Sequence, residues 1–390
     1  MKKIHYTLFL ILVSGSMAVA QVTNPGNLAG QNTDSLNRTI TTAVPFLTIT
    51  PDARAGGMGD VGVATSADAN SVHWNPAKLA FINNDIGFAL SYTPWLGKII
   101  NDMSIAYLAG YYKISKEEAV AVSMRYFDLG EIIFTENEQD QGTLFNPREF
   151  AFDATYSRML SQHLGIGVTA RYIHSNLTGS FTSGGLEARP GNSVAADLAV
   201  YFDKDLLFSG NNSNLAFGAT ISNIGAKLTY SDENNRDFIP TNLRLGSAFT
   251  TNLDPYNKIT LALDFNKLLV PSPQNDGSED DKSLLSGVFG SFGDAEGGFS
   301  EELEEITLSV GAEYWYNDTF AARLGYFYEA ENKGNRKYLT VGLGFRYQVF
   351  GIDFAYLVPA EQEHPLAETL RFTLLFNFDK GTKDEESVTD

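Results

Sequence analysis

Apolar and polar positions alternate with a period of two through most of the chain between residues 85 and 379. In the stretch 339–349 every odd position is apolar, whereas the even positions are small or polar. The same alternation recurs at 259–266, 164–172 and 370–378. This period is that of a β-strand whose two faces meet different surroundings. The pattern therefore predicts an all-β fold.

The length and number of these segments favour a transmembrane barrel. Strands of about ten residues that tilt across a bilayer are typical of outer-membrane barrels. We expect a 14-stranded antiparallel transmembrane β-barrel, and an even strand number returns both termini to the periplasm. The expected strands are 85–95, 103–113, 118–128, 150–160, 163–175, 192–202, 213–223, 241–251, 257–267, 306–316, 319–330, 336–349, 351–358 and 367–379.

The connections between the expected strands alternate in length as such a barrel requires. Those after odd-numbered strands should be long and external, and they are the segments 129–149, 176–191, 224–240 and 268–305. Those after even-numbered strands should be short turns, and most contain only a few residues. The segment 203–212 is the exception, since it reads as a sizeable loop on the side of the short turns.

A soluble β-sandwich also alternates, but it exposes a face rich in Lys, Glu and Thr. Here the second face is rich in Gly and Ala and poor in Lys, which favours a crowded barrel lumen. We expect its charges to pair across strands, because buried charges need partners; a polar conduit is the alternative. These charges are Arg125, Asp153, Arg171, Asp197, Arg244, Asp264, Glu313, Arg323, Arg346, Asp353 and Arg371.

The first residues have the features of an exported protein. Lys2 and Lys3 precede the apolar run 8–13, and the stretch closes on Ala18-Val19-Ala20, which predicts a signal peptide over 1–20. A flexible segment, 21–42, is expected to follow, and an acidic tail, 380–390, to end the chain. No later stretch offers the roughly 18 apolar residues that a membrane helix needs.

Composition removes several classes of function. The formal net charge of −19 argues against nucleic acid as a partner. The absence of cysteine excludes disulfides, thiolate metal sites and a cysteine nucleophile. The histidines have no metal-binding spacing, and they include His73, His163, His174 and His364.

Catalysis finds little support in the motifs. There is no Gly-x-Ser-x-Gly elbow. The adjacent pair His174-Ser175 could suggest a membrane-embedded lipid deacylase, but neighbouring strand residues point to opposite faces. We therefore expect neither a catalytic residue, nor a metal site, nor a cofactor.

The segment 43–84 differs from the expected barrel in composition and pattern. It contains the stretch 51–65, rich in Gly and Ala, and the stretch 67–80, which includes Asn75-Pro76-Ala77. This leader resembles the amino-terminal hatch of the FadL-like barrels, and within that superfamily it is most similar to the PorV family of the type IX secretion system. The resemblance implies a hatch over 43–84 in the lumen and a barrel over 85–379. The chain departs from the hatch pattern at Lys78, where Gly is usual.

Trp74, Asn75 and Pro76 are the residues we expect to shape the hatch. Proline fixes φ and asparagine caps a turn, so a structural role is favoured over a gating or ligand-binding one. A hatch also makes physical sense, because a fourteen-stranded barrel is wider than its own strand side chains can fill.

The long segment 268–305 is the expected partner-binding loop. It holds ten acidic residues against one base, Lys282. An exposed apolar run often marks a protein contact, although a loop that folds over the barrel mouth and buries its own Phe289 and Phe292 is an equal alternative. The acidic cluster 276–281 lacks EF-hand spacing, so a calcium site is not expected. The apolar residues are Leu284, Leu285, Val288, Phe289 and Phe292.

The resemblance to the PorV family implies a non-enzymatic role in the cell outer membrane. Such a barrel would sit in outer-membrane lipid beside a SprA-like translocon barrel. It would bind secreted proteins by their C-terminal signal domains and pass them to a PorU-like sortase for surface attachment. The alternative is a FadL-like transporter of hydrophobic small molecules, which would need a continuous apolar pocket behind the hatch.

Overall fold

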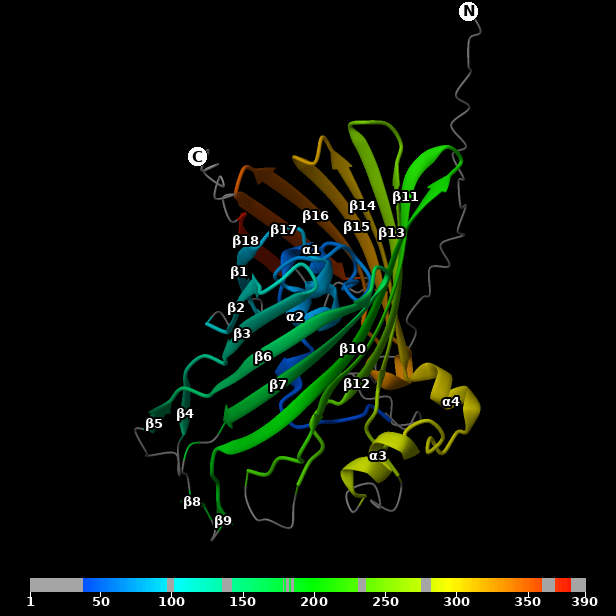
Figure 1. Cartoon of the computed structure of the whole chain (residues 1–390). Helices are drawn as coiled ribbons and strands as arrows, with labels where there is room; N and C mark the ends of the chain where they lie inside the picture. Colours follow the sequence, from blue (N-terminus) through cyan, green and yellow to red (C-terminus); the bar gives the residue numbers. More distant parts are fainter. Residues whose placement is uncertain are drawn as a thin grey trace, which may run out of the picture. The chain divides into compact units, whose positions relative to one another are not determined.

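In the computed structural model, the residues that the structure describes are 38–96, 102–134, 142–177, 179, 182–183, 186–230, 236–274, 282–359 and 369–379. They form a closed barrel of fourteen antiparallel strands (Figure 1). All fourteen expected strands are confirmed. They are β1 (Ile86–Pro94), β2 (Ser104–Lys113), β3 (Glu118–Asp128), β6 (Arg148–Ser161), β7 (Leu164–Asn176), β10 (Gly191–Phe208), β11 (Asn211–Gly225), β12 (Asn242–Asn252), β13 (Asn257–Leu268), β14 (Ile306–Tyr316), β15 (Phe320–Tyr328), β16 (Lys337–Tyr347), β17 (Phe350–Pro359) and β18 (Leu370–Phe378).

Each barrel strand pairs with the next barrel strand along the chain, and β1 pairs with β18 to close the ring. The alternation in the sequence becomes an alternation of burial. In β15, for example, Leu324 and Tyr326 are exposed on the outer face, whereas Arg323 and Gly325 are buried on the inner face. The two faces therefore differ as a barrel wall requires, with apolar side chains outside and charged or small ones inside.

The expected loop 203–212 is wrong. β10 continues to Phe208 and β11 begins at Asn211, so that only Ser209 and Gly210 remain as a turn. Both turn residues have positive φ, 53° and 85°, as tight hairpins of this kind demand. The strands run on through Asp203 and Lys204, whose polarity hid the continuation because apolar alternation marks only the part of a strand that lines the wall.

Shorter elements are not part of the barrel wall. Two small hairpins, β4–β5 and β8–β9, lie in the long connections that follow β3 and β7. No helix in the described residues is both long enough and apolar enough to cross a membrane. The remaining elements are η1 (Pro45–Thr48), α1 (Ala53–Gly56), α2 (Ser71–Trp74), η2 (Pro76–Phe81), β4 (Ile132–Phe134), β5 (Thr143–Phe145), β8 (Thr182–Ser183), β9 (Leu186–Glu187), α3 (Leu284–Gly290), α4 (Phe299–Glu304) and η3 (Glu331–Lys333).

The expected signal peptide 1–20, most of the flexible segment 21–42 and the acidic tail 380–390 lie outside the described residues. The segment 43–84 is described throughout and carries η1, α1, α2 and η2.

Candidate functional site

Residues 43–84 contact inward-facing side chains from different sides of the barrel, and Figure 1 shows α1 and α2 among the strands. The Asp264 carboxylate of β13 accepts the backbone N–H groups of Gly62 at 2.8 Å and Val63 at 2.9 Å. The Thr373 hydroxyl of β18 accepts the N–H of Ala53 at 2.8 Å. Four strands separate β13 from β18 in the order of the barrel, so the segment is held from more than one direction.

Glycines on the inner face let this segment approach the wall closely. A Cβ atom on Gly311 of β14 would lie 2.5 Å from the carbonyl oxygen of Met58. A Cβ on Gly325 of β15 would overlap the backbone of Met58 and Gly59, and it would lie 2.6 Å from the same oxygen. Gly311 and Gly325 face each other in the strand register. At these two positions the inner face needs glycine because the backbone of residues 58–59 lies directly against the wall.

The three residues expected to shape the segment all make buried contacts. Trp74 donates its indole N–H to Asp52 Oδ1 at 2.7 Å. Asn75 Oδ1 accepts the backbone N–H two residues ahead at 3.1 Å, which is a turn cap, and Nδ2 donates to the carbonyl of Val200 on β10 at 3.1 Å. Pro76 begins η2. These contacts are compatible with the structural role, which stays a prediction, with gating or ligand binding as its alternative.

Lys78, at which the chain departs from the expected hatch pattern, is buried. Its ammonium donates to the carbonyl of Gly62 at 2.7 Å and lies 3.2 Å from Thr65 Oγ1. The longer side chain thus ties η2 to the turn that precedes α2. The departure from the pattern adds an internal contact in this segment.

Most inner-face charges form ion pairs, as expected. Arg171 contacts Asp153 at 2.6 Å and Asp197 at 3.0 Å. Arg323 contacts Glu313 at 2.7 Å and Asp353 at 2.8 Å. The interpretation that charges pair across strands is confirmed for these residues. In a polar conduit, by contrast, such charges would face water and would not be paired with one another.

Four charges depart from that expectation because their partners belong to residues 43–84. One of them is Arg371, whose guanidinium lies 3.3 Å from Asp60 Oδ1. Arg125 donates to the carbonyls of Phe46 at 2.8 Å and Leu47 at 2.7 Å, rather than to a carboxylate on a strand. Arg244 contacts His73, and Asp264 accepts the N–H groups described above. Arg54 of α1 also joins the strand network, with its guanidinium 2.8 Å from Glu313 Oε1. The alternation in the sequence predicted that the strand residues among these face the lumen, but it did not identify their partners.

His174 and Ser175 do not converge. His174 Nδ1 lies 2.8 Å from Asn192 Oδ1 on the exposed face, whereas the buried Ser175 hydroxyl donates to Glu149 Oε1 at 2.6 Å. The pair therefore lacks the serine–histidine contact that nucleophilic catalysis requires.

The expected partner-binding loop presents an apolar surface. α3 contains Leu284, Leu285, Val288 and Phe289, and it begins at a Ser283 cap. Leu285 is 64% exposed, Phe289 74% and Phe292 54%, so the alternative in which the loop buries these phenylalanines is wrong. Val288, in contrast, is buried. α4 adds two exposed residues that sequence reasoning missed, Phe299 and Leu303, whose spacing of four places them on one helix face.

A buried set of ion pairs, which we call the loop network, fixes α4 to the barrel. Lys267, at the end of β13, contacts Glu302 at 3.0 Å and Glu305 at 2.5 Å. Lys333, in η3, contacts Glu301 at 2.7 Å and Glu305 at 3.0 Å. The loop network therefore joins the end of β13, the connection that carries α4 and the connection that carries η3. Three of the ten acidic residues of segment 268–305 serve this attachment.

The loop network should weaken in acid. Burial tends to raise the pKa of Glu301, but hydrogen bonds from Lys333, the Gly297 N–H and Arg38 lower it below its ordinary value of 4.5. A carboxylate whose folded-state pKa is lowered stabilises the fold above its unfolded pKa, and this contribution is lost as pH falls through the folded pKa. We expect amide hydrogen exchange in α4, measured by mass spectrometry, to speed up between about pH 5 and pH 3, beyond its intrinsic pH dependence.

In Lys333→Gln the exchange of α4 should already be faster near neutral pH, and the acid transition should be smaller. An α4 exchange profile that is the same in wild type and Lys333→Gln would contradict the role given to this lysine.

The acidic residues 276–281 lie outside the described residues, so the expectation that they hold no calcium site stays a prediction. In the part of the chain that the structure describes, no group of three or more His, Cys, Asp or Glu is placed to hold a metal ion.

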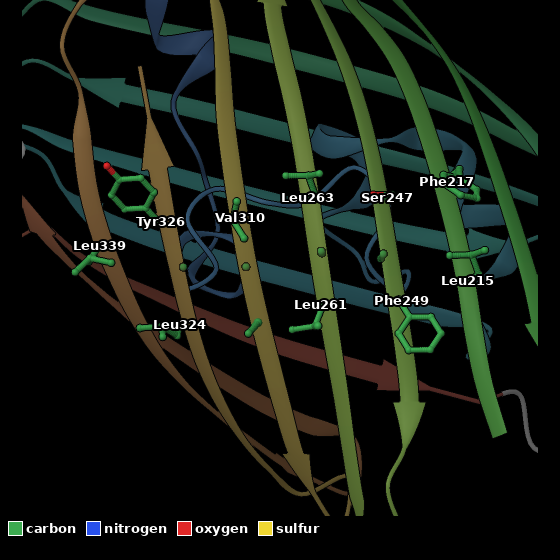
Figure 2. A pocket seen from close by; sticks show the side chains of 15 residues that line it. Leu215, Phe217, Ser247, Phe249, Leu261, Leu263, Val310, Leu324, Tyr326 and Leu339 are labelled. Atoms are coloured by element: carbon green, nitrogen blue, oxygen red, sulfur yellow. The ribbon is translucent and has the colours of Figure 1, made fainter. Parts of the chain in front are cut away.

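The outer wall carries an apolar hollow of about 530 Å³ across β11 to β16. Figure 2 shows side chains that line it on neighbouring strands, among them Leu261, Leu324 and Leu339. These three are about half exposed, whereas Arg323, beside Leu324 in β15, is buried on the other face. The hollow therefore faces away from the lumen and is a different feature from the interior pocket that small-molecule transport would need.

The comparison with protein families decides where this barrel belongs. A family model described as "Type IX secretion system protein PorV" matches residues 31–275, more than half of the chain. The chain belongs to the PorV family. Membership makes this PorV-family barrel an outer-membrane component of type IX secretion, as the leader 51–80 indicated.

Several solved structures are similar to this PorV-family chain. The toluene transporter TbuX of Ralstonia pickettii is 12% identical, with 84% of this chain and 98% of that chain covered and a TM-score of 0.46. The toluene transporter TodX of Pseudomonas putida is 10% identical, with 82% and 95% covered and a TM-score of 0.47. A FadL homologue of Pseudomonas aeruginosa is 10% identical, with 85% and 99% covered and a TM-score of 0.46. No curated protein matches the chain.

Proposed function

We propose that this PorV-family barrel is a non-catalytic receptor that binds secreted proteins by their C-terminal signal domains and delivers them to the surface-attachment machinery. The supporting observation is the surface of α3 and α4, where Leu285, Phe289, Phe292, Phe299 and Leu303 are all more than half exposed. Exposed apolar side chains gathered on one connection often mark a protein contact. Aromatic residues are also enriched where binding energy concentrates.

The loop network supports the same role. It holds α4 through buried ion pairs, so the apolar residues of α4 are already in place before a partner arrives. A pre-arranged surface loses less conformational entropy on binding than a loop that must become ordered. In this proposal the long connections face the cell exterior and both termini the periplasm. The translocon barrel and the sortase are the expected neighbours.

Residues 43–84 have a separate part in the proposal. We propose that they form a hatch that closes the lumen while partners bind at the long connections. The hydrogen bonds from Gly62, Val63 and Ala53 to β13 and β18 support this assignment. The barrel would then act through its loops without opening a path for small molecules.

A triple variant, Leu285→Ser with Phe289→Ser and Phe292→Ser, tests the receptor role. We expect a deletion strain that carries this variant to lose most of its surface-attached type IX cargo, measured by proteomics of the cell surface. The reason is that three exposed apolar contacts are removed while the caps and ion pairs of the loop remain. Barrel amount and heat-dependent gel mobility should be those of wild type.

Phe208→Ser is the matched control, because Phe208 is also exposed but lies at the short-turn end of β10. It should leave cargo at the wild-type level. Normal cargo display by the triple variant would contradict the receptor proposal. A growth defect of the deletion strain confined to one hydrophobic nutrient, with normal surface proteins, would favour the transport alternative.

A further inference from the structure

The imidazole of His73, in α2, lies between two guanidinium groups from distant strands. Arg125 Nη2, from β3, lies 2.7 Å from His73 Nδ1. Arg244 Nη1, from β12, lies 3.4 Å from His73 Nε2 and 3.3 Å from the His73 carbonyl. All three side chains are buried. Each ring nitrogen of the histidine therefore faces an arginine.

The short contact fixes the tautomer. A guanidinium has only donors, so Arg125 must donate and Nδ1 must accept. The proton of the neutral ring is then on Nε2. This N–H faces Arg244, which also has nothing but N–H groups to offer. At this side of the ring two donors face each other, and an acceptor is required between or beside them.

The charges around His73 point to the same need. Among the described residues, neither Arg125 nor Arg244 lies within ion-pair distance of a carboxylate, whereas Arg171 holds both Asp153 and Asp197. Arg125 is compensated by two backbone carbonyls. Arg244 is only 4% exposed, and in the described residues its polar contacts are to His73, with the Trp74 ring 5.0 Å away. The carboxylates of Asp197 and Asp264 act on it through space, without an ion-pair contact. A buried cation with so little compensation is costly.

A third donor lies next to Arg244. Thr220 of β11 is its direct register partner, and it faces inward with 1% of its surface exposed. Its hydroxyl has no hydrogen-bond partner among the described groups. A buried hydroxyl without a partner is rare in folded proteins. It is also a suitable ligand for an anion that a guanidinium already attracts.

We infer that Arg244, the Nε2–H of His73 and the Thr220 hydroxyl bind a small inorganic anion of the size of chloride. The anion supplies the acceptor that these donors lack and places a negative charge in direct contact with Arg244. It joins α2 of the N-terminal segment to β11 and β12. This site is independent of the receptor role, since it lies inside the barrel and makes no use of α3 or α4.

The test uses the purified full-length barrel in detergent, with chloride exchanged for gluconate at constant ionic strength. We expect the thermal unfolding midpoint of wild type to rise with chloride and to saturate, as binding to the folded state alone requires. Thr220→Val should shift the chloride dependence to about tenfold higher concentration, because one hydrogen bond to a charged ligand is lost. Arg244→Met should abolish it.

Arg158→Met is the control, since Arg158 is an exposed arginine on β6. It should retain the wild-type chloride response. In crystals grown with bromide, an anomalous peak is expected beside Arg244 and Thr220. A midpoint that does not respond to chloride, or a response that Arg244→Met and Thr220→Val leave unchanged, would overturn the inference and leave water as the occupant.

Discussion

Gly325→Val is expected to displace the N-terminal segment from the wall while the barrel still closes. Any Cβ at this position overlaps backbone atoms of Met58 and Gly59, which cannot rotate away as a side chain can. The displacement breaks the hydrogen bond of 2.8 Å from the Gly59 N–H to Thr340 Oγ1. Overpacking of a well-packed interior costs about 1–3 kcal/mol even where side chains can adjust. We expect residues 55–62 to become accessible to hydrogen exchange and to protease.

Gly293→Ala supplies the control for this prediction. Gly293 has open space where the new Cβ would lie, so this variant should behave as wild type in both measurements. Protection of residues 55–62 that survives in Gly325→Val would show that the segment is not seated against β15 as described.

Glu313→Gln is expected to cause the largest loss of stability among single interior substitutions. Glu313 is buried and contacts two guanidinium groups, those of Arg54 and Arg323. Removal of its charge leaves both cations with less compensation, and disruption of a buried ion pair typically costs about 3–5 kcal/mol. Denaturant unfolding of the detergent-solubilised protein measures the loss. Arg54→Met should cost less in the Glu313→Gln background than in wild type, since the pair is already broken.

The exposed ion pair of Lys258 and Asp318, with a distance of 2.5 Å, is the matched control. Asp318→Asn should change the free energy of unfolding by less than about 1 kcal/mol, because water screens the pair. An equal, small effect of Glu313→Gln and Asp318→Asn would mean that the interior network is hydrated and contributes little.

Alternation in the sequence was sufficient to predict the barrel strands, because each strand separates an apolar outer face from a crowded inner one. The same rule failed at 203–208, where Asp203, Lys204 and Asp205 interrupt the alternation and three apolar residues then follow without a break. The alternation of long and short connections holds for the barrel, and the short β10–β11 turn removes the one expected exception. Which end faces the exterior stays a prediction. The exposure of Phe289 and Phe292 could not be decided from sequence, since it depends on how α3 packs.

Partners within the interior were beyond sequence reasoning for a different reason. Arg54 and Glu313 are separated by 259 positions, and only the closed ring brings them together. The sequence predicted that the Arg244 side chain faces the lumen. Its neighbour His73 could not be predicted, because it lies in a segment without the alternating pattern of a strand. Gly325 is one of many glycines on the inner face, and its close approach to Met58 depends on the register of two strands.

The long β10–β11 hairpin creates a risk of edge-to-edge association between molecules. β10 pairs with β7 only as far as Phe202, so the backbone from Lys204 to Phe208 has a strand partner on one side alone. Such an unpaired rim is a template on which a foreign strand can add, and exposed Leu207 and Phe208 would favour it. Asp203, Lys204 and Asp205 place charges along this rim, as natural sheets do to discourage aggregation.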